Sequence, residues 1–284
     1  MKKAIAVALA AFMSVSVFAQ TNSRKLISGV YNFVTEESTD WKILEPTFKT
    51  VDPVAEKFVF TGSFTIKAII GLSRYDFTCT IVKQNDDFSV DLTNMSSYAC
   101  DKNFKMIKKG NRYNTSDRVA SEYAKQMKDE ISKRMAKWSD EEYEQNLGKS
   151  VTSPLILGCV ANNSALVFKK FLKDYSVIGR PITIKIFVTK VDEAPEYAEG
   201  YSYYVAGRAL SGYKLDSSGF LNFPTYASVM VYTNNDAVIS LKPAELRDGL
   251  MTGGKSGSEY EVKGTVKDVS RAETGGLSII KVNE

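Results

Sequence analysis

The spacing of apolar residues changes along this chain, and that change constrains the fold more than any other sequence feature. Between residues 57 and 98, apolar side chains recur at every second position, the period of a strand with one buried face. Between residues 116 and 147 they recur at every third or fourth position, the period of a helix. Beyond Pro181 the period returns to two. The chain therefore combines helices with two separate blocks of strands.

The first block predicts an antiparallel meander whose last two strands join at a turn over residues 84–87. A register in which Lys83 faces Phe88 places Cys79 opposite Leu92. The charged helix that follows carries one apolar stripe, formed by Val119, Tyr123, Met127, Ile131, Met135 and Trp138. We expect this stripe to cover the apolar face of the meander, because each of these surfaces needs a partner.

A second, short helix is predicted to begin at the capping-box sequence Ser139–Glu142 and to end near Gly148. The short polar segment Lys149–Pro154 is the expected domain boundary. The predicted divisions are an export signal at residues 1–19, an α+β domain at 20–150 and a helix-plus-barrel domain at 151–284.

The second strand block predicts an OB-like barrel after a helix capped by Asn163 or Ser164. The five expected strands are Ile182–Val188, Tyr201–Leu210, Ala227–Thr233, Tyr260–Val269 and Leu277–Val282. A long connection separates the third from the fourth, as in OB-folds. The fold class is therefore α+β: an N-terminal antiparallel sheet with a long packed helix, followed by a C-terminal OB-like five-stranded β-barrel.

Parts of this second half resemble a known family. Asn163-Ser164-Ala165, followed by Tyr175, Gly179 and the strand at 182–191, is similar to the start of exported OB domains of the tRNA-anti-like type. The segment Val262–Val266 is similar to the fourth strand of that family. The resemblance covers about 115 residues and implies the barrel. It implies no activity, because the family name carries no function for exported members.

The N-terminus has the pattern of a cleaved secretory signal peptide. Lys2 and Lys3 precede an apolar stretch over residues 4–17, and small residues end at Ala19. We expect cleavage after Ala19 and a periplasmic or secreted product. The alternative is a membrane anchor, but neither this run nor any later one reaches the roughly 18 apolar residues that a spanning helix needs.

Composition excludes several functions. The chain has no histidine, which removes Ser-His-Asp and Cys-His catalysis and every histidine metal site. Loss of Lys2 and Lys3 lowers the net charge from +4 to about +2, which argues against nucleic acid as a partner. Gly249–Ser256 matches the phosphate-loop pattern, but a strand follows it where that loop needs a helix. We therefore expect no nucleotide, other cofactor or metal, and we assign no catalytic residue.

The three cysteines leave the disulfide state open. With Cys79 opposite Leu92, Cys100 lies eight residues further along the strand, about 26 Å away. A disulfide needs Cα atoms within about 7 Å, so this pair is disfavoured. A Cys100–Cys159 disulfide and three buried free thiols are both compatible with the sequence.

A basic cluster lies between the meander and the long helix. It consists of Lys102, Lys105, Lys108, Lys109 and Arg112. A solvated loop is the favoured interpretation, and contact with an anionic lipid or polymer is the alternative.

Tyrosines concentrate in the second strand block. Seven lie between residues 197 and 232: Tyr197, Tyr201, Tyr203, Tyr204, Tyr213, Tyr226 and Tyr232. In OB barrels the outer face of the second and third strands is the usual ligand surface, which makes Tyr201, Tyr203, Tyr213 and Tyr232 the predicted ligand-binding residues. The alternative is that strands simply favour tyrosine. Tyr201 and Tyr203 share a face while Tyr204 points oppositely, so the tyrosines cannot all line one surface.

These features favour an exported, non-enzymatic binding protein that engages a glycan or protein partner through the aromatic barrel face. A rival hypothesis places function in the first domain, because a sheet curled around a long helix resembles helix-grip proteins. That resemblance implies binding of an apolar small molecule or lipid. A third, weaker hypothesis is a carboxylate-based hydrolase of cell-envelope polymer, which needs two acids converging in one cleft.

Overall fold

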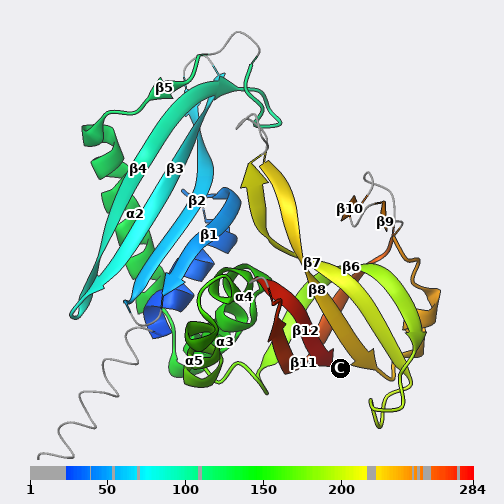
Figure 1. Ribbon diagram of the computed structural model, residues 1–284. Helices are drawn as coiled ribbons and strands as arrows, with labels where there is room; N and C mark the ends of the chain where they lie inside the picture. Colours follow the sequence, from blue (N-terminus) through cyan, green and yellow to red (C-terminus); the bar gives the residue numbers. More distant parts are fainter. Residues whose placement is uncertain are drawn as a thin grey trace, which may run out of the picture. The chain divides into compact units, whose positions relative to one another are not determined.

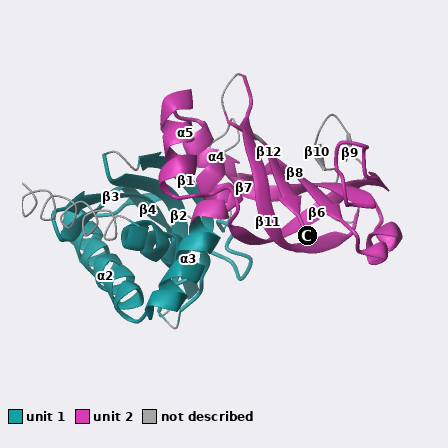
Figure 2. Ribbon diagram, turned by 90° about the horizontal axis from the view of Figure 1, so that it is seen from below, with its two compact units in different colours: residues 1–150 teal, residues 151–284 magenta. Residues whose placement is uncertain are grey.

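The computed structural model describes residues 24–284 except 39, 53–54, 69–70, 108–110, 216–221, 245, 248–249, 252–256 and 274–275. The predicted export signal at residues 1–19 lies outside this range. The chain divides into two compact units, residues 1–150 and 151–284 (Figure 2). None of the described helices is long and apolar enough to cross a membrane.

The first unit is built on a five-stranded antiparallel sheet in which the strands follow chain order (Figure 1). The strands are β1 (Leu44–Asp52), β2 (Lys57–Ala68), β3 (Gly71–Gln84), β4 (Asp87–Cys100) and β5 (Tyr113–Asn114). The predicted meander is present as β2, β3 and β4. The predicted hairpin register is confirmed, since Lys83 pairs with Phe88 and Cys79 with Leu92.

Helix α2 (Asp117–Ala136) packs along the sheet against β4 (Figure 1). Its buried residues are Ala120, Ala124, Met127 and Ile131. Ser116 occupies the N-cap position, but its side chain makes no capping hydrogen bond. The long packed helix predicted from the apolar stripe is therefore confirmed.

Helix α3 (Asp140–Thr152) begins at the predicted capping box. The Ser139 N–H donates to the Glu142 carboxylate at 2.8 Å, and the Glu142 N–H donates to the Ser139 hydroxyl at 3.3 Å. The prediction that this helix ends near Gly148 is wrong. Leu147 and Val151 are both fully buried one turn apart, and this buried side carries the helix through the polar segment to Thr152.

In the second unit, five strands close into a barrel in the order β11-β12-β8-β7-β6, with β11 paired back to β6. They are β6 (Pro181–Glu193), β7 (Tyr203–Leu215), β8 (Asn222–Thr233), β11 (Glu259–Arg271) and β12 (Leu277–Asn283). β8 and β12 are parallel, and every other neighbouring pair is antiparallel. Numbered along the chain, the order is 1-2-3-5-4, as in an OB-fold barrel. The predicted OB-like barrel is confirmed.

Two helices precede the barrel, α4 (Pro154–Ala161) and α5 (Ala165–Asp174). The Ser164 hydroxyl accepts the N–H of Val167 at 3.3 Å, which confirms Ser164 as the cap of α5. Helix α4 contacts β7 and β12. The long connection between β8 and β11 contains a short 3-10 helix, η1 (Asp236–Ser240), and the strands β9 (Leu246–Arg247) and β10 (Leu250–Met251). Most of the segment at residues 249–256, which matches the phosphate-loop pattern, lies outside the described residues.

All three cysteines are buried, and none of them forms a disulfide bond. The structure therefore has three buried thiols rather than a Cys100–Cys159 disulfide. Burial raises the pKa of the Cys79 thiol well above its ordinary value, so this side chain packs as a neutral apolar group.

Candidate functional site

The register of β7 and β8 decides which side chains face the barrel interior. The buried residues that pair across these strands are Val205 with Val231, Gly207 with Val229 and Ala209 with Ala227. Because side chains alternate along a strand, the even-numbered residues at 204–210 and 226–232 face outward. This register places the four tyrosines predicted to bind a ligand on different parts of the barrel.

Tyr203 belongs to the inward-facing set. It pairs with Thr233 at one end of the barrel, and its hydrogen bond to the Asp236 carboxylate raises its pKa above the ordinary value. Tyr203 is therefore bonded to the connection after β8 and does not share the outer face.

Tyr232 faces outward but is only 5% exposed. The Tyr201 ring lies against it, with the ring centroids 6.2 Å apart. Burial raises the pKa of Tyr232 to about 12, and the neighbouring Tyr197 adds to the increase. The structure thus brings Tyr201 and Tyr232 together, with Tyr197 beside them, but leaves little of the Tyr232 ring open to a ligand.

Tyr213 lies far from this cluster. It pairs with Pro224 on β8, eight residues before Tyr232, which corresponds to about 26 Å along the strand. The four predicted residues therefore do not form one surface.

A different set of side chains does share the outer face of β6, β7 and β8. The half-buried residues of this set, which we call the outer barrel strip, are Phe187, Tyr204, Arg208, Leu210, Tyr226 and Met230. Phe187 and Tyr226 meet edge to face, with centroids 6.0 Å apart at 87°. Arg208 pairs with Phe187 on one side and with Ser228 on the other, so it lies on the strand between those that carry Phe187 and Tyr226.

Cations accompany the aromatic rings of the strip. The Lys190 ammonium lies 5.3 Å from the centre of the Tyr204 ring and pairs with the Asp192 carboxylate at 2.7 Å. Hydrogen bonds to Asp192 and to Tyr204 raise the pKa of Lys190 above its ordinary value. The strip can therefore offer dispersion, cation–π and charge-assisted contacts.

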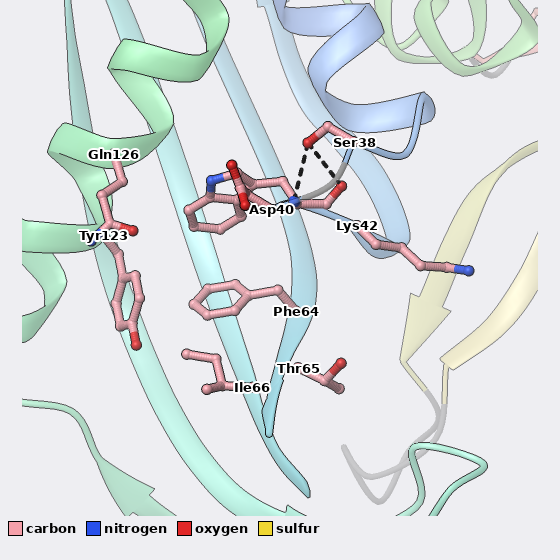
Figure 3. A pocket seen from close by; sticks show the side chains of 9 residues that line it. Ser38, Asp40, Lys42, Phe64, Thr65, Ile66, Tyr123 and Gln126 are labelled. Atoms are coloured by element: carbon pink, nitrogen blue, oxygen red, sulfur yellow. Dashed lines mark hydrogen bonds between the residues drawn. The ribbon is translucent and has the colours of Figure 1, made fainter. Parts of the chain in front are cut away.

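A pocket of about 430 Å³ lies in the first unit, between β2, α2 and the segment before β1 (Figure 3). Trp41, Phe64 and Tyr123 supply its aromatic part, and Asp40 and Gln126 supply polar groups. The rings contact one another: the Phe64 centroid lies 5.0 Å from those of Trp41 and Tyr123. Its volume falls in the range of small-ligand sites.

Carboxylates and cations converge on the opposite side of the same sheet. Arg74, 7% exposed, donates to Glu45 at 2.5 Å and to Asp76 at 3.1 Å. Arg112 donates to the second Asp76 oxygen at 2.5 Å and covers the Tyr98 ring. Both acids are thus held by arginine, which is the pattern of a structural ion-pair network rather than of a catalytic acid pair.

The basic cluster before α2 is divided by this network. Arg112 is tied to Asp76, Lys102 and Lys105 are exposed, and Lys108 and Lys109 lie outside the described residues. Nor does any group of three His, Cys, Asp or Glu side chains among the described residues come close enough to hold a metal ion.

No protein-family model, curated protein or solved structure matches the chain. The resemblance to tRNA-anti-like OB domains is therefore not supported by a match to a family model. The OB-like assignment rests on the strand order and on the parallel β8–β12 pair. Function has to be argued from the surfaces described above.

Proposed function

We propose that this chain is an exported, non-enzymatic binding protein whose outer barrel strip binds a protein partner. The observation that carries the proposal is the row of half-exposed Phe187, Tyr204 and Tyr226 rings around Arg208 and Met230. Aromatic residues, Met and Arg are the types enriched at protein interfaces and at their energetic hot spots. The strip also lies on the second and third barrel strands, where OB-folds commonly bind their ligands.

A glycan is the alternative ligand for the same strip, because flat sugar faces also stack on aromatic rings. The mutual packing of Phe187 and Tyr226 favours a protein partner. Edge-to-face contact at 87° cannot present both ring faces side by side to one sugar, whereas it suits an apolar side chain inserted beside them.

Site-specific photo-cross-linking tests the proposal. A benzophenone amino acid replaces Tyr226 in one variant of the exported protein and Tyr113, which is 62% exposed in the first unit, in a matched control. We expect a discrete protein adduct at position 226 that is absent at 113. The purified partner should then bind Arg208→Ala at least tenfold more weakly than the unmodified protein, as for an interface hot spot.

Two results would count against this function. Equal affinity of the partner for Arg208→Ala, Tyr226→Ala and the unmodified protein would remove the strip from the interface. Suppression of the adduct by a soluble cell-envelope glycan would assign the strip to a glycan instead.

The pocket in the first unit supports a second candidate function, binding of an apolar small molecule. The aromatic side chains of Trp41, Phe64 and Tyr123, which line the pocket, support this candidate. Retention of a lipid by the purified protein, observed by native mass spectrometry, would favour this candidate.

A further inference from the structure

Strand β2 extends beyond the strand that flanks it on one side. β1 pairs with β2 from Asp52 opposite Lys57 to Leu44 opposite Ser63 and stops there. β3 pairs with β2 five residues further, to Ala68 opposite Gly71. Among the described residues, the segment Phe64–Ala68 therefore has a strand on one side only.

On the other side of this segment, the backbone groups have no partner among the described residues. In an antiparallel sheet, residues alternately direct their N–H and C=O groups to one neighbour and then to the other. Beyond the pairing with β3, no backbone hydrogen bond from another described segment reaches Phe64–Lys67. A row of this kind is a template for pairing with a further strand.

The aromatic pocket lies beside the same edge. Phe64, Thr65 and Ile66 all line it, together with Tyr123 and Gln126 of α2. Figure 3 shows Phe64 and Ile66 pointing toward α2, while Thr65 points the other way. A strand added next to β2 would alternate in the same manner, so every second side chain would enter the pocket.

The mouth of the pocket carries an uncompensated negative charge. Lys42 forms an ion pair with Glu37, whereas the exposed Asp40 carboxylate has no hydrogen bond or ion pair with another described residue. A basic side chain next to the inserted residue would find its partner in Asp40.

We propose that the free edge of β2 at Phe64–Lys67 binds an extended peptide segment of a partner protein by strand addition. A large apolar side chain of the peptide enters the pocket and packs against the contacting rings of Trp41, Phe64 and Tyr123, and an adjacent basic residue pairs with Asp40. Backbone hydrogen bonds supply affinity in this mode of recognition, and the pocket supplies specificity. The unpaired backbone distinguishes such a site from a pocket for a free lipid, which needs no strand edge. The site is independent of the outer barrel strip.

The test uses fluorescein-labelled peptides of alternating Thr and Val, with Leu, Phe, Trp or Ala at the centre and Lys or Glu beside it. Binding to the full-length protein is followed by fluorescence anisotropy. We expect the Phe or Trp peptide with Lys to bind, and replacement of its central residue by Ala to weaken binding at least tenfold. Methylation of the peptide backbone nitrogens next to the central residue should also weaken binding at least tenfold, because it removes donors while leaving the protein unchanged.

Protein variants locate the site. Tyr123→Ala should weaken peptide binding at least fivefold, and Asp40→Asn should remove the preference for Lys over Glu. Tyr226→Ala on the barrel should leave peptide binding unchanged, so that failure here is distinguishable from failure of the barrel strip. Equal binding of methylated and unmethylated peptides would overturn strand addition in favour of simple pocket binding. Absence of binding by every peptide at about 1 mM, the weak end of specific recognition, would overturn the proposal as a whole.

Discussion

The sheet of the first unit and the barrel of the second place their phenylalanine side chains in opposite ways. In the first unit the rings are interior: Phe33, Phe60 and Phe77 are at most 3% exposed. In the second unit the barrel interior is formed by small and aliphatic side chains, while Phe187 and Tyr226 lie half-exposed outside. Aromatic density along a sequence therefore does not identify a binding surface. The face on which each ring lies has to be known.

The difference follows from the space that each architecture encloses. A helix packed on a sheet leaves a layer about 10 Å deep, which rings can fill. A five-stranded barrel is much narrower, and small residues such as Gly207, Ala209 and Ala227 line its interior. Inward-facing tyrosines are then confined to the barrel ends, where Tyr203 bonds to Asp236 and Tyr260 to Glu284.

The largest effect expected from this comparison is loss of a core ring in the first unit. Phe60 is fully buried and contacts Phe48 and Phe77. Phe60→Ala should destabilise the first unit by about 3–5 kcal/mol, because it leaves a cavity that the surrounding rings cannot close. Trp41 and Trp138 are the two tryptophans of the chain, so urea unfolding followed by tryptophan fluorescence reports on this unit. A loss below about 1 kcal/mol would show that the aromatic core is loosely packed.

In the barrel, the corresponding substitution adds a side chain where there is no space for it, instead of removing a buried ring. A Cβ on Gly264 would collide with the Asn283 carbonyl and the Val282 side chain. Gly264→Ala should therefore cost about 1–3 kcal/mol in the second unit, as overpacking does. Hydrogen exchange measured separately for peptides of each unit should show faster exchange in β11 and β12 but not in β2–β4.

Gly158→Ala is the matched control for this prediction. Its added methyl group would lie at ordinary contact distance, 3.5 Å, from the Ser211 side chain, and alanine favours the helix in which it lies. Equal effects of the two substitutions would contradict the close approach of β11 and β12.

Much of this architecture could be predicted from the period of the apolar residues, and the failures have local physical causes. β1 was missed because register irregularities between Leu44 and Thr47 and between Phe48 and Thr50 break its alternation. The helix at residues 24–35 was also missed, although Leu26, Val30 and Phe33 recur at helical spacing. Its polar residues Ser28 and Asn32 are buried as well, so its burial does not follow its polar pattern.

The candidate site was less predictable than the fold. Alternation correctly separates Tyr203 from Tyr204, but it cannot say which of the two faces outward until a buried neighbour such as Val205 is paired with Val231. Burial of Tyr232 depends on Tyr201, which precedes β7 and is 31 residues away in the chain. The pocket beside β2 depends on where β1 stops, and the irregular register of β1 conceals that point.

The smallest expected effect compares one half-exposed tyrosine from each unit. Tyr75 contacts two rings, stacking on Phe64 at 5.2 Å and meeting Tyr123 at 5.7 Å, whereas the ring of Tyr226 meets that of Phe187. Each aromatic pair contributes about 0.5–1.5 kcal/mol beyond the area that it buries. Tyr75→Ala should therefore destabilise its unit by about 1 kcal/mol more than Tyr226→Ala destabilises the barrel, as measured by hydrogen exchange in each unit. If Tyr226→Ala proved the more costly, the outer ring would be a structural element of the barrel. The half-exposed position of Tyr226 would then no longer be evidence for a partner-binding surface.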